Sequence, residues 1–518
     1  MSTLHPAPPA VHVDPRPLRD LVAPLQEGGL VGDVVGPADV LVTDVTIDSR
    51  AVAPGALFGA VAPDTHHGRD GHLFVDDALA RGASAALISD EWLAERASST
   101  PVPLGKGERS RSAAWVPATD TRAALAGVAT AFYGRPADAL TTLGVTGTNG
   151  KTTTVFLLHH MLTALGATAG LVGTVENRIG AERYATSFTT PEAPALQRFL
   201  RACVEADCSH VAMEVSSHGL ALSRVGGVAF DVAVFTNLTR DHLDYHASFE
   251  DYRDAKKRLF AGLRPHTTAV VNGDDPAWTH MVEGTHAGVV TFGTTQAVDV
   301  RVEVLETSLD GLLLRLGGEE RRFRLLGRFN ALNLAAAYAC GRALGYDRAA
   351  VLDALAAAPG VPGRFETVRG GGVVGVVDYA HTPDALDNVL ATAAEMVGDE
   401  SRLWVVFGAG GDRDAGKRAP MGEVASRHTP NVVLTSDNPR TEDPDAILDD
   451  VEGGVGRPAH RIADRAEAIR YAARHAAPGD VVVVAGKGHE TYQIVGRERR
   501  DFDDRVVLRD ALASRPAR

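Results

Sequence analysis

Short hydrophobic runs bounded by Gly or Pro recur along the whole chain and alternate with stretches rich in Ala and Leu. The short runs predict buried strands, and the Ala- and Leu-rich stretches predict helices. Alternation of the two is typical of proteins in which helices pack on mainly parallel sheets. The pattern therefore predicts an α/β fold.

The length of 518 residues exceeds what one hydrophobic core usually organises and suggests about three domains. We expect a first domain over residues 1–137, a central domain over 138–361 and a C-terminal domain over 362–518. The first domain has short strands around a turn in DVTIDSRAVAPGALFGAV and then a predicted helix in FVDDALARGASAAL. A polar loop over residues 97–113 interrupts it, and no role is predicted for this loop.

Four segments of the predicted C-terminal domain share one design, in which a buried strand runs into a loop rich in Gly or polar residues. They are VVGVVDYAHTPDAL, LWVVFGAGGDRDAGKR, NVVLTSDNPRTEDP and DVVVVAGKGHETYQ. In an open parallel sheet, such loops gather at the carboxyl ends of the strands, where ligands bind. We therefore expect these loops to form one side of a binding site.

The third of these loops contains SDNPRTED, residues 436–443, which presents one arginine among three acids. Pro439 fixes its own φ and biases Asn438 toward extended geometry, so the turn is stiff. The guanidinium of Arg440 can bind two oxygens at once, which indicates recognition of a carboxylate or a phosphate. The alternative is a surface turn in which Arg440 forms local ion pairs with its acidic neighbours.

The segment LGVTGTNGKTTTVFLLHHML combines an apolar strand, a Gly-rich turn and a predicted amphipathic helix. Backbone N–H groups of such a turn, together with the helix N-terminus, bind phosphates. Lys151 would reach the β- and γ-phosphates of a nucleotide, and Thr152 would give its hydroxyl to Mg²⁺. The strict phosphate-loop pattern asks for Gly where this chain has Val145, so a structural Gly-rich turn is the alternative.

Two further segments bring acidic groups to strand ends near this turn. HVAMEVSSHGL has Glu214 at the end of an apolar run, and VAVFTNLTRDHLDYH has Asp241 and His242 after another. Carboxylate and hydroxyl oxygens are ligands that suit Mg²⁺. His242 and His246 have the spacing of a zinc-binding pair, but no third ligand has matching spacing. Magnesium is therefore the expected metal, and His159 is expected to pack or to lie at the surface.

The composition restricts the classes of partner. The formal net charge of −14 argues against general binding to nucleic acid or to anionic membranes. No run approaches the ~18 apolar residues of a spanning helix, and the Pro-rich N-terminus lacks the apolar core of a signal peptide. Cys203, Cys208 and Cys340 have no zinc-like spacing and are typical of buried thiols in a reducing compartment. We expect a cytoplasmic protein with no nucleic-acid partner and no membrane insertion.

Lysine is rare, since only six of the 52 Lys and Arg residues are lysines. In an Arg-rich chain, lysines should persist where a compact or deprotonatable amine is needed and a guanidinium cannot replace it. Lys151, Lys417 and Lys487 lie in Gly-rich turns, and Lys256 follows the cluster of His and Asp. These four lysines are therefore candidates for functional roles.

Ten segments of the chain resemble, in order, motifs of the Mur ligases of peptidoglycan synthesis. They are GVTGTNGKTTT, TTPEA, MEVSSHGL, FTNLTRDHLDYH, GRFNALN, GRFE, VVDYAHTPDAL, GAGGDRDAGKR, SDNPRTEDP and AGKGHETYQ. The resemblance runs from IDSR, near residue 47, to DDRVVLRD near the C-terminus, and it is most specific for the tripeptide synthetases of the family. It implies three α/β domains: a small UDP-substrate domain, a central ATPase domain of phosphate-loop type and a Rossmann-like C-terminal domain.

The resemblance also implies a reaction. ATP would phosphorylate the D-Glu carboxylate of UDP-MurNAc-L-Ala-D-Glu, and an amine of the incoming amino acid would attack the acyl phosphate to form an amide. Within the family, the D-N-P-R loop marks members that add meso-diaminopimelate, whose distal carboxylate would be the group that Arg440 binds. We expect a monomer that uses ATP and Mg²⁺. A folylpolyglutamate-synthase-like ligase and a nucleotide-binding module without ligase activity are the alternatives.

Matching positions imply the residues of each binding site. The ATP site would comprise Gly147, Thr148, Asn149, Gly150, Lys151, Thr152, Thr153, Asn330, Arg364, Asp378 and His381. The UDP-substrate site would comprise Ile47, Ser49, Asp64, Thr65, His66, Thr189, Thr190, Ser216 and Arg224. The diaminopimelate site would comprise Arg413, Asp437, Asn438, Pro439, Arg440, Gly486 and Glu490.

The resemblance extends to the catalytic and metal-binding residues. The residues implied in catalysis are Lys151, Glu214, His242 and Lys256. The implied metal ligands are Thr152, Glu214, His242 and Lys256. Lys256 would be carboxylated by CO₂ and bridge to a second metal, a modification that arginine cannot carry. Phe188 and Leu222 depart from the Asn and Gln of some relatives, so we expect two polar contacts to the substrate to be missing.

Overall fold

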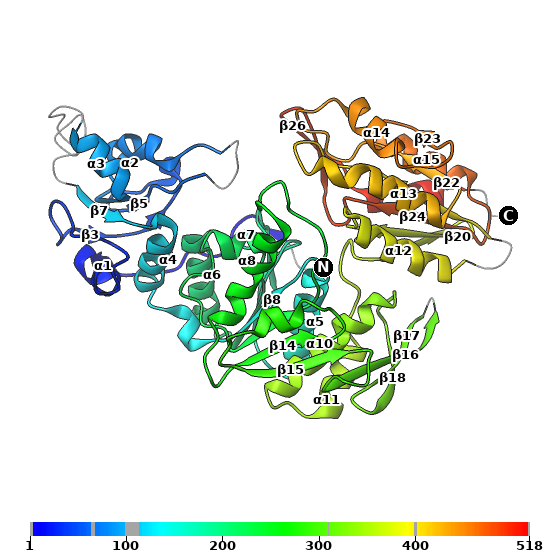
Figure 1. The fold of residues 1–518 in the computed structure, drawn as a ribbon, viewed down its shortest axis with the longest axis horizontal. Helices are drawn as coiled ribbons and strands as arrows, with labels where there is room; N and C mark the ends of the chain where they lie inside the picture. Colours follow the sequence, from blue (N-terminus) through cyan, green and yellow to red (C-terminus); the bar gives the residue numbers. More distant parts are fainter. Residues whose placement is uncertain (1–3, 64–67, 99–112, 309, 398–400, 516–518) are drawn as a thin grey trace.

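The computed structural model describes residues 4–63, 68–98, 113–308, 310–397 and 401–515. In Figure 1 these residues form three lobes, and each lobe is built on its own sheet with helices packed on it. This arrangement confirms the predicted α/β class with three domains. The boundaries after residues 137 and 361 stay predictions, and most of the polar loop 97–113 lies outside the described residues.

The first lobe contains a four-stranded parallel sheet in the order β4-β5-β6-β7. Its strands are β4 (Val45–Thr46), β5 (Leu57–Gly59), β6 (Ala85–Ser89) and β7 (Ala114–Ala118). Apolar side chains of helices cover both faces of this sheet. One face carries α1 (Leu18–Glu27) and α4 (Thr121–Phe132), and the other carries α2 (Val75–Arg81) and α3 (Asp90–Ser98). A small pair of strands, β2 (Arg16–Pro17) and β3 (Leu41–Val42), flanks α1.

One prediction for this lobe is wrong, because FVDDALARGASAAL does not form a single helix. The helix α2 ends at Gly82, whose φ of 111° lies in the left-handed region. Glycine has no Cβ, so it adopts this conformation readily and terminates helices. The residues that follow enter β6, which pairs with β5 and β7 and is buried between them.

The central lobe contains a twelve-stranded sheet in the order β1-β11-β10-β9-β12-β8-β13-β14-β15-β16-β17-β18. Its inner strands from β9 to β15 are parallel. They are β8 (Thr141–Thr146), β9 (Ala169–Val172), β12 (His210–Glu214), β13 (Val232–Phe235), β14 (Thr268–Asn272) and β15 (Gly288–Gly293). The outer strands are β1 (Leu4–His5), β10 (Asn177–Ile179), β11 (Glu182–Tyr184), β16 (Val300–Ser308), β17 (Gly311–Leu316) and β18 (Glu319–Phe323).

The N-terminal strand β1 pairs with β11 and forms one edge of the central sheet. Figure 1 marks the N-terminus at the central lobe. Helices cover the parallel strands on both faces. One face carries α5 (Lys151–Ala164), α10 (Phe329–Ala343) and α11 (Arg348–Ala356). The other carries α6 (Ala193–Glu205), α8 (Phe249–Ala261) and α9 (Trp278–Val282). The short helix α7 (Ser217–Ala221) follows β12 and contacts α8.

The helix after the Gly-rich turn, α5, was predicted to be amphipathic, and this prediction is wrong. Its buried residues occupy nearly every position from Thr152 to Leu162. The sheet covers one side of the helix, while α10 and α11 pack against the others. The phosphate-loop candidate is therefore anchored in the core of the lobe at its helical end.

The C-terminal lobe contains a six-stranded sheet in the order β19-β20-β24-β21-β22-β23. Its strands are β19 (Glu366–Gly370), β20 (Val373–Asp378), β21 (Leu403–Phe407), β22 (Asn431–Leu434), β23 (His460–Arg461) and β24 (Val481–Ala485). All of its pairs except β19–β20 are parallel. Its helices are α12 (Pro383–Glu395), α13 (Arg418–His428), α14 (Pro444–Glu452), α15 (Arg465–His475) and α16 (Asp504–Ala513). A hairpin, β25 (Tyr492–Val495) and β26 (Glu498–Asp501), follows β24.

Candidate active site

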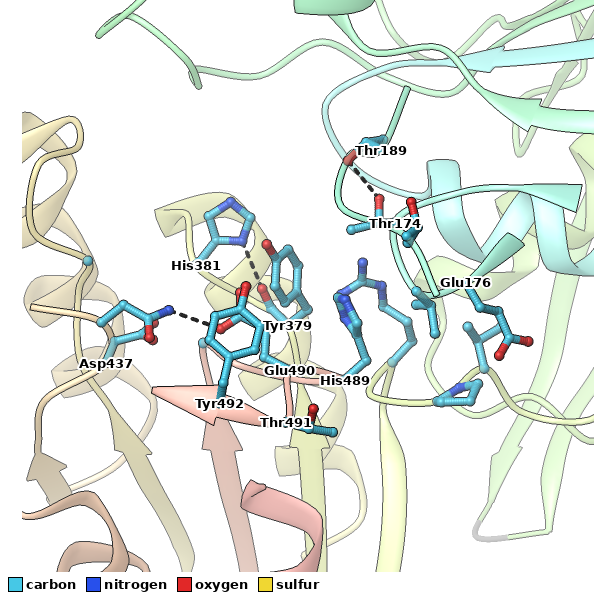
Figure 2. A pocket seen from close by; sticks show the side chains of 18 of the residues that line it. Thr174, Glu176, Thr189, Tyr379, His381, Asp437, His489, Glu490, Thr491 and Tyr492 are labelled. Carbon is cyan, nitrogen blue, oxygen red and sulfur yellow. Dashed lines mark hydrogen bonds between the residues drawn. The ribbon is translucent and has the colours of Figure 1, made fainter. Parts of the chain in front are cut away.

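A cavity of about 1930 Å³ lies between the central and C-terminal lobes. Its walls come from the carboxyl ends of β9, β12 and β13 on one side and of β20, β21, β22 and β24 on the other. Figure 2 shows Thr174 and Thr189 of the central lobe across from Tyr379, His381, Asp437 and Glu490 of the C-terminal lobe. The four strand-and-loop segments predicted from the sequence therefore share one edge, as expected.

The Gly-rich turn after β8 requires its glycines. At Gly147, with φ of 148°, a Cβ would lie 1.9 Å from the hydroxyl of Thr236. At Gly150, with φ of 87°, a Cβ would lie 2.5 Å from the side-chain oxygen of Asn333. Val145, which departs from the strict pattern, is a fully buried strand residue that pairs with β12 and β13. The departure thus lies in the strand and not in the turn.

Lys151, the first residue of α5, folds back over this turn. Its Nζ donates hydrogen bonds to the carbonyl oxygens of Gly147 and Thr148, each at 2.8 Å. Burial lowers the pKa of this amine, and the nearby carboxylates of Glu214 and Asp241 act in the opposite direction. The amine of Lys151 therefore lies against the turn, close to the N-terminus of α5.

Glu214 is the centre of a buried cluster of oxygens. Its Oε2 accepts hydrogen bonds from the hydroxyls of Thr152 at 3.0 Å and Thr174 at 3.1 Å. Its Oε1 accepts one from the backbone N–H of Thr174 at 2.7 Å. One carboxylate and two hydroxyls beside a phosphate-loop turn are a hard-oxygen donor set, so these residues fit a Mg²⁺ ion. No sequence motif indicated Thr174, since a lone threonine after a strand carries no signal.

Lys256 is buried on α8 and reaches the same turn. Its side chain is 1% exposed, and its Nζ donates a hydrogen bond to the carbonyl oxygen of Gly147 at 2.9 Å. The amine also lies 4.3 Å above the ring of Tyr252. Burial, reinforced by the charge of Lys151, lowers the pKa of Lys256 well below its usual value. The environment of this amine therefore favours its neutral form more than water does.

His242 lies beside Asp241 in the loop after β13. Its Nε2 is 3.5 Å from Oδ2 of Asp241, and its backbone φ of 56° is left-handed. Burial lowers the pKa of the imidazole against the pull of Asp241. Within the described part of the chain, no three His, Cys, Asp or Glu side chains are grouped as they would be to hold a metal ion. Among the described residues, His242 and His246 therefore have no third side chain with which to form a zinc site.

The two lobes touch directly at the phosphate-loop candidate. Arg364 donates a hydrogen bond through Nη2 to the hydroxyl of Thr152 at 3.1 Å, and its guanidinium lies 4.3 Å from the ring of Tyr379. Asn149 donates one to Oδ2 of Asp384 at 2.8 Å. Arg364, Thr152 and Asn149 were all predicted to belong to the nucleotide site, and Asp384 lies in the first turn of α12.

The other predicted nucleotide residues take different positions around this contact. Asn330 donates a hydrogen bond to Leu326 O at 2.7 Å and accepts one from Asn333 Nδ2 at 2.8 Å. Asp378 accepts hydrogen bonds from the N–H groups of Phe365 and Ala380, each at 2.7 Å, so its carboxylate fixes the chain around Arg364. His381 lines the cavity, and burial lowers its pKa to about 4. Gly147, Thr148, Asn149, Gly150, Thr152 and Thr153 form the turn and the start of α5.

The predicted amino-acid site lies at the ends of β22 and β24. Asp437, Asn438 and Pro439 are buried there, and Arg440 is half-buried with a left-handed φ of 53°. The backbone of Arg440 is held by hydrogen bonds with Ile494 and Gly496, which tie this loop to the hairpin β25–β26. Gly486 lines the cavity after β24, and its φ of 116° is one that side chains avoid.

The acids around Arg440 do not neutralise it. Glu442 forms a salt bridge with Arg418 at 2.8 Å, and Asp443 caps the N-terminus of α14. The Arg440 Nη1 donates to the carbonyl oxygen of Gly411 at 2.7 Å. Among residues with described positions, no carboxylate lies within 4.0 Å of the Arg440 guanidinium. The local ion pairs of the surface-turn alternative are therefore not formed.

Arg413 lies on the facing loop after β21. Its guanidinium is an exposed part of the cavity wall, and its charge contributes, after burial, to lowering the pKa of Arg440. Two guanidinium groups of like charge thus face the same space. The carboxylates of Asp437 and Glu490 line the same cavity, and Figure 2 shows both residues on the C-terminal lobe.

The predicted UDP-substrate residues divide into three groups. Thr189, Thr190, Ser216 and Arg224 line the cavity next to Glu214. Ile47 and Ser49 lie on the first lobe, at and after the end of β4, and do not line this cavity. Asp64, Thr65 and His66 lie outside the described residues.

Polar contacts hold Arg224 at the cavity wall and link this wall to the first lobe. Arg224 donates to the carbonyl oxygen of Thr190 at 3.2 Å and forms a salt bridge with Glu192 at 2.8 Å. Arg122 of the first lobe reaches the same Glu192 at 3.2 Å. Phe188 is 47% exposed, and its ring lies 5.0 Å from the guanidinium carbon of Arg224.

The two departures from the family pattern therefore differ in position. Phe188 presents an aromatic face to the cavity, stacked with the Arg224 guanidinium. Leu222 is buried, with 8% of its surface exposed, and it does not line the cavity.

Comparisons with known proteins agree with this architecture. Residues 145–341 match the Mur ligase middle domain, and residues 363–488 match the family model described as Mur ligase, glutamate ligase domain. A UDP-N-acetylmuramoyl-L-alanyl-D-glutamate–2,6-diaminopimelate ligase from Geobacillus kaustophilus is 44% identical over 93% of this chain and 96% of its own. The chain belongs to the Mur ligase family.

Solved structures show the same fold. A structure of a UDP-N-acetylmuramoyl-L-alanyl-D-glutamate–2,6-diaminopimelate ligase is 34% identical, with a TM-score of 0.65, and covers 96% of this chain and 99% of its own. A folylpolyglutamate synthase from Mycobacterium tuberculosis is 20% identical, with a TM-score of 0.58, and covers 71% of this chain and 92% of its own. The second likeness shows a shared fold only. In the described part of the chain, no helix is both long and apolar enough to cross a membrane.

Proposed function

We propose that this protein is an ATP-dependent amide ligase that joins meso-diaminopimelate to the D-Glu carboxylate of UDP-MurNAc-L-Ala-D-Glu. This step belongs to the synthesis of peptidoglycan precursors in the cytoplasm. The observation that carries the proposal is that Arg413, Arg440, Asp437 and Glu490 line one cavity. Two cationic and two anionic groups in one pocket complement an amino acid that carries both charges at each end. The family and the printed activity of the full-length relatives support the same conclusion.

In the first step, a carboxylate must be made electrophilic by phosphorylation. The turn Gly147–Gly150 and the N-terminus of α5 supply backbone N–H groups for the phosphates, and Lys151 and Arg364 supply positive charge. Thr152 and Glu214 would hold Mg²⁺, which offsets the charge that develops on the transferring phosphoryl group. Lys151 must exchange its two loop carbonyls for phosphate oxygens to do this.

The expected nucleotide and metal residues extend this site. Asn330, Asp378 and His381 belong to the ATP side, and His242 stands where a second metal ligand is expected. Lys256 would react with CO₂ through its neutral amine, forming a carbamate and releasing a proton. The lowered pKa supports this role, since only an unprotonated amine can form the new N–C bond.

In the second step, the amine of the acceptor attacks the acyl carbon, and phosphate leaves as the amide forms. The acceptor would be held at its far end by a bidentate pair between its carboxylate and Arg440. Asp437 and Glu490 would bind the ammonium beside that carboxylate, and Arg413 the other carboxylate. Asn438, Pro439 and Gly486 would shape the pocket.

The UDP-substrate would extend from the cavity toward the first lobe. Thr189, Thr190, Ser216 and Arg224 would line the peptide and sugar path, and Ile47, Ser49, Asp64, Thr65 and His66 would hold the uridine end. Domains bounded near residues 137 and 361 would then each hold one substrate. We propose that one monomer is sufficient, because all three lobes of a single chain supply the three binding regions.

The test is an acceptor comparison with the purified full chain. ADP release would be measured with UDP-MurNAc-L-Ala-D-Glu and meso-diaminopimelate, L-lysine or L-ornithine. We expect release that depends on the UDP-substrate and is fastest with meso-diaminopimelate. Turnover with a folate and glutamate instead would favour a folylpolyglutamate-type ligase. ATP hydrolysis that no acceptor stimulates would favour a nucleotide-binding module.

A further inference from the structure

Lys487 lies in one of the predicted Gly-rich turns and is completely buried. The proposed mechanism gives it no role. It follows Gly486 at the end of β24, and its exposed fraction is 0%. Its Nζ lies 2.9 Å from Glu490 Oε2, 3.0 Å from Asn438 Oδ1 and 3.4 Å from Asp437 Oδ1. One ammonium therefore contacts all three polar side chains on the anionic side of the acceptor pocket.

These contacts fix which oxygens remain for a ligand. Asn438 also donates through Nδ2 to Glu490 Oε2 at 3.0 Å and accepts from the N–H of Ile494 at 2.9 Å. Among the described residues, neither Asp437 Oδ2 nor Glu490 Oε1 takes part in a hydrogen bond. Lys487 thus binds one oxygen of each carboxylate, and the second oxygen of each accepts no hydrogen bond from a described residue. Asp437 Oδ2 lies beside Gly486, and Asp437, Gly486 and Glu490 all line the cavity.

The ammonium also changes the charge of the pocket. Burial alone would raise the pKa of Asp437, but the charges of Lys487 and Arg465 hold it below its usual value. Arg465 is already neutralised by Asp504, to which it is bonded at 2.7 and 2.8 Å in a fully buried pair. Lys487 has no other carboxylate within the described residues, so it balances one of the two negative charges of Asp437 and Glu490.

We infer that Lys487 is a positioning residue that sets acceptor selectivity through charge, favouring an amino acid with a zwitterionic far end over one with a bare ammonium there. With Lys487 present, the two carboxylates together offer one net negative charge, which suits an ammonium whose neighbouring carboxylate binds Arg440. Without it, the pocket carries one more negative charge and attracts a bare ammonium more strongly. This inference rests on the proposed function, because it concerns the same acceptor pocket.

The experiment compares Lys487→Met and Lys487→Gln with the wild-type full chain. Steady-state kinetics would be measured with meso-diaminopimelate and with L-lysine at saturating ATP and UDP-substrate. We expect kcat/KM for meso-diaminopimelate to fall, mainly through the acceptor KM. The ratio of kcat/KM for L-lysine to that for meso-diaminopimelate should rise by roughly tenfold or more, since the lost charge lies within a few ångströms of the distal ammonium. The KM values for ATP and UDP-substrate should stay within about twofold.

Two further variants separate charge from simple disruption of the fold. Lys257→Gln removes the same charge from α8, where Lys257 pairs with Glu283 outside the cavity, and it should leave the ratio unchanged. The double variant Lys487→Met/Glu490→Gln removes one charge of each sign and should return the ratio toward the wild-type value. If Lys487→Met lowers activity with both acceptors equally, the residue is only structural and the inference is wrong. If the wild type ligates no amino acid, the proposed function itself fails.

Discussion

Lys151 and Lys256 donate hydrogen bonds to the same atom, the carbonyl oxygen of Gly147, at 2.8 and 2.9 Å. The two amines come from different helices, α5 and α8, and converge on the turn after β8. Two ammonium groups this close would repel each other, and burial already penalises charge on both. After burial, the charge of Lys151 lowers the pKa of Lys256 further, which favours the neutral form of that amine. The neutral amine is the form in which the proposed reaction of Lys256 with CO₂ would take place.

Replacement of Lys151 tests the phosphate-loop assignment. We expect Lys151→Ala to abolish ATP-dependent ligation while the fold is kept, because it removes a charge that the transition state needs. Contacts of this kind contribute on the order of 10² or more in rate. The measurement is ADP release with all substrates present, beside Lys257→Ala as the matched lysine variant. Near-wild-type turnover of Lys151→Ala would show that the turn is only structural.

Replacement of Lys256 tests for the carbamate. Lys256→Arg keeps a positive charge but cannot react with CO₂, so we expect it to be as inactive as Lys256→Ala. Short carboxylic acids should partly restore Lys256→Ala, because they can occupy the space of the carbamate. Lys257→Arg, the adjacent substitution of the same kind, should remain active. An active Lys256→Arg enzyme would mean that a cation, or no particular group, is sufficient at this position.

The buried histidine of α5 predicts how stability depends on pH. Burial, followed by the charge of Arg178, lowers the pKa of His159 from its usual value of 6.5 to about 4. The folded state therefore favours neutral His159, and its contribution to stability is complete above pH 6.5 and is lost as the pH falls toward 4. The loss by pH 4.5 should be on the order of 2 kcal/mol.

The measurement is denaturant unfolding at pH 7 and pH 4.5. His159→Gln should lose less stability between the two values than the wild type does. His266→Gln alters an exposed histidine and serves as the control, with a pH dependence like that of the wild type. Equal acid sensitivity of His159→Gln and the wild type would contradict the lowered pKa. Of the two positions that the sequence allowed for His159, packing or surface, the structure shows packing, since the residue is buried.

Much of the fold could be predicted because the signals are local. Strands such as β20, β21, β22 and β24 are continuous apolar runs, and the loops after them are marked by Gly and polar residues. The turn after β8 was predictable because Gly147 and Gly150 have no tolerated substitute there. The failure at Gly82 has a local cause, because this left-handed glycine ends α2. The failure along α5 has a tertiary cause, since the sheet, α10 and α11 together bury nearly all of that helix.

The site was only partly predictable because local sequence patterns do not determine the order of strands in a sheet. Lys487 was notable as a rare lysine in a Gly-rich turn, but its contacts with Asp437 and Asn438 cross about 50 positions of sequence. They form because β24 lies between β20 and β21, with β22 next in the sheet. No motif indicated Thr174, and Glu192 lies in TTPEA without a role that the sequence predicts. Such residues become visible only when the lobes are assembled around the cavity.

Arg440 gives the sharpest test of acceptor recognition. Lysine and meso-diaminopimelate differ at the far end of the side chain, where only the latter has a carboxylate beside its amine. A matched acceptor gains charge-assisted hydrogen bonds with a net value of roughly 1.5–3 kcal/mol. An acceptor that lacks the carboxylate leaves a half-buried guanidinium unpaired, and sites of this kind can reject such analogues by roughly 10⁴–10⁵.

Arg440→Ala should therefore reduce kcat/KM for meso-diaminopimelate by orders of magnitude, mostly through the acceptor KM and not that for ATP. Lysine need not become a good substrate, because Arg413 and the pocket shape still disfavour it. Arg440→Lys should recover only part of the loss, since a point charge cannot form two parallel hydrogen bonds. Arg427→Ala is the control in the same lobe, where the side chain pairs with Asp387 at the surface. If Arg440→Ala kept its KM for meso-diaminopimelate, the left-handed Arg440 would serve only to hold the loop against β25.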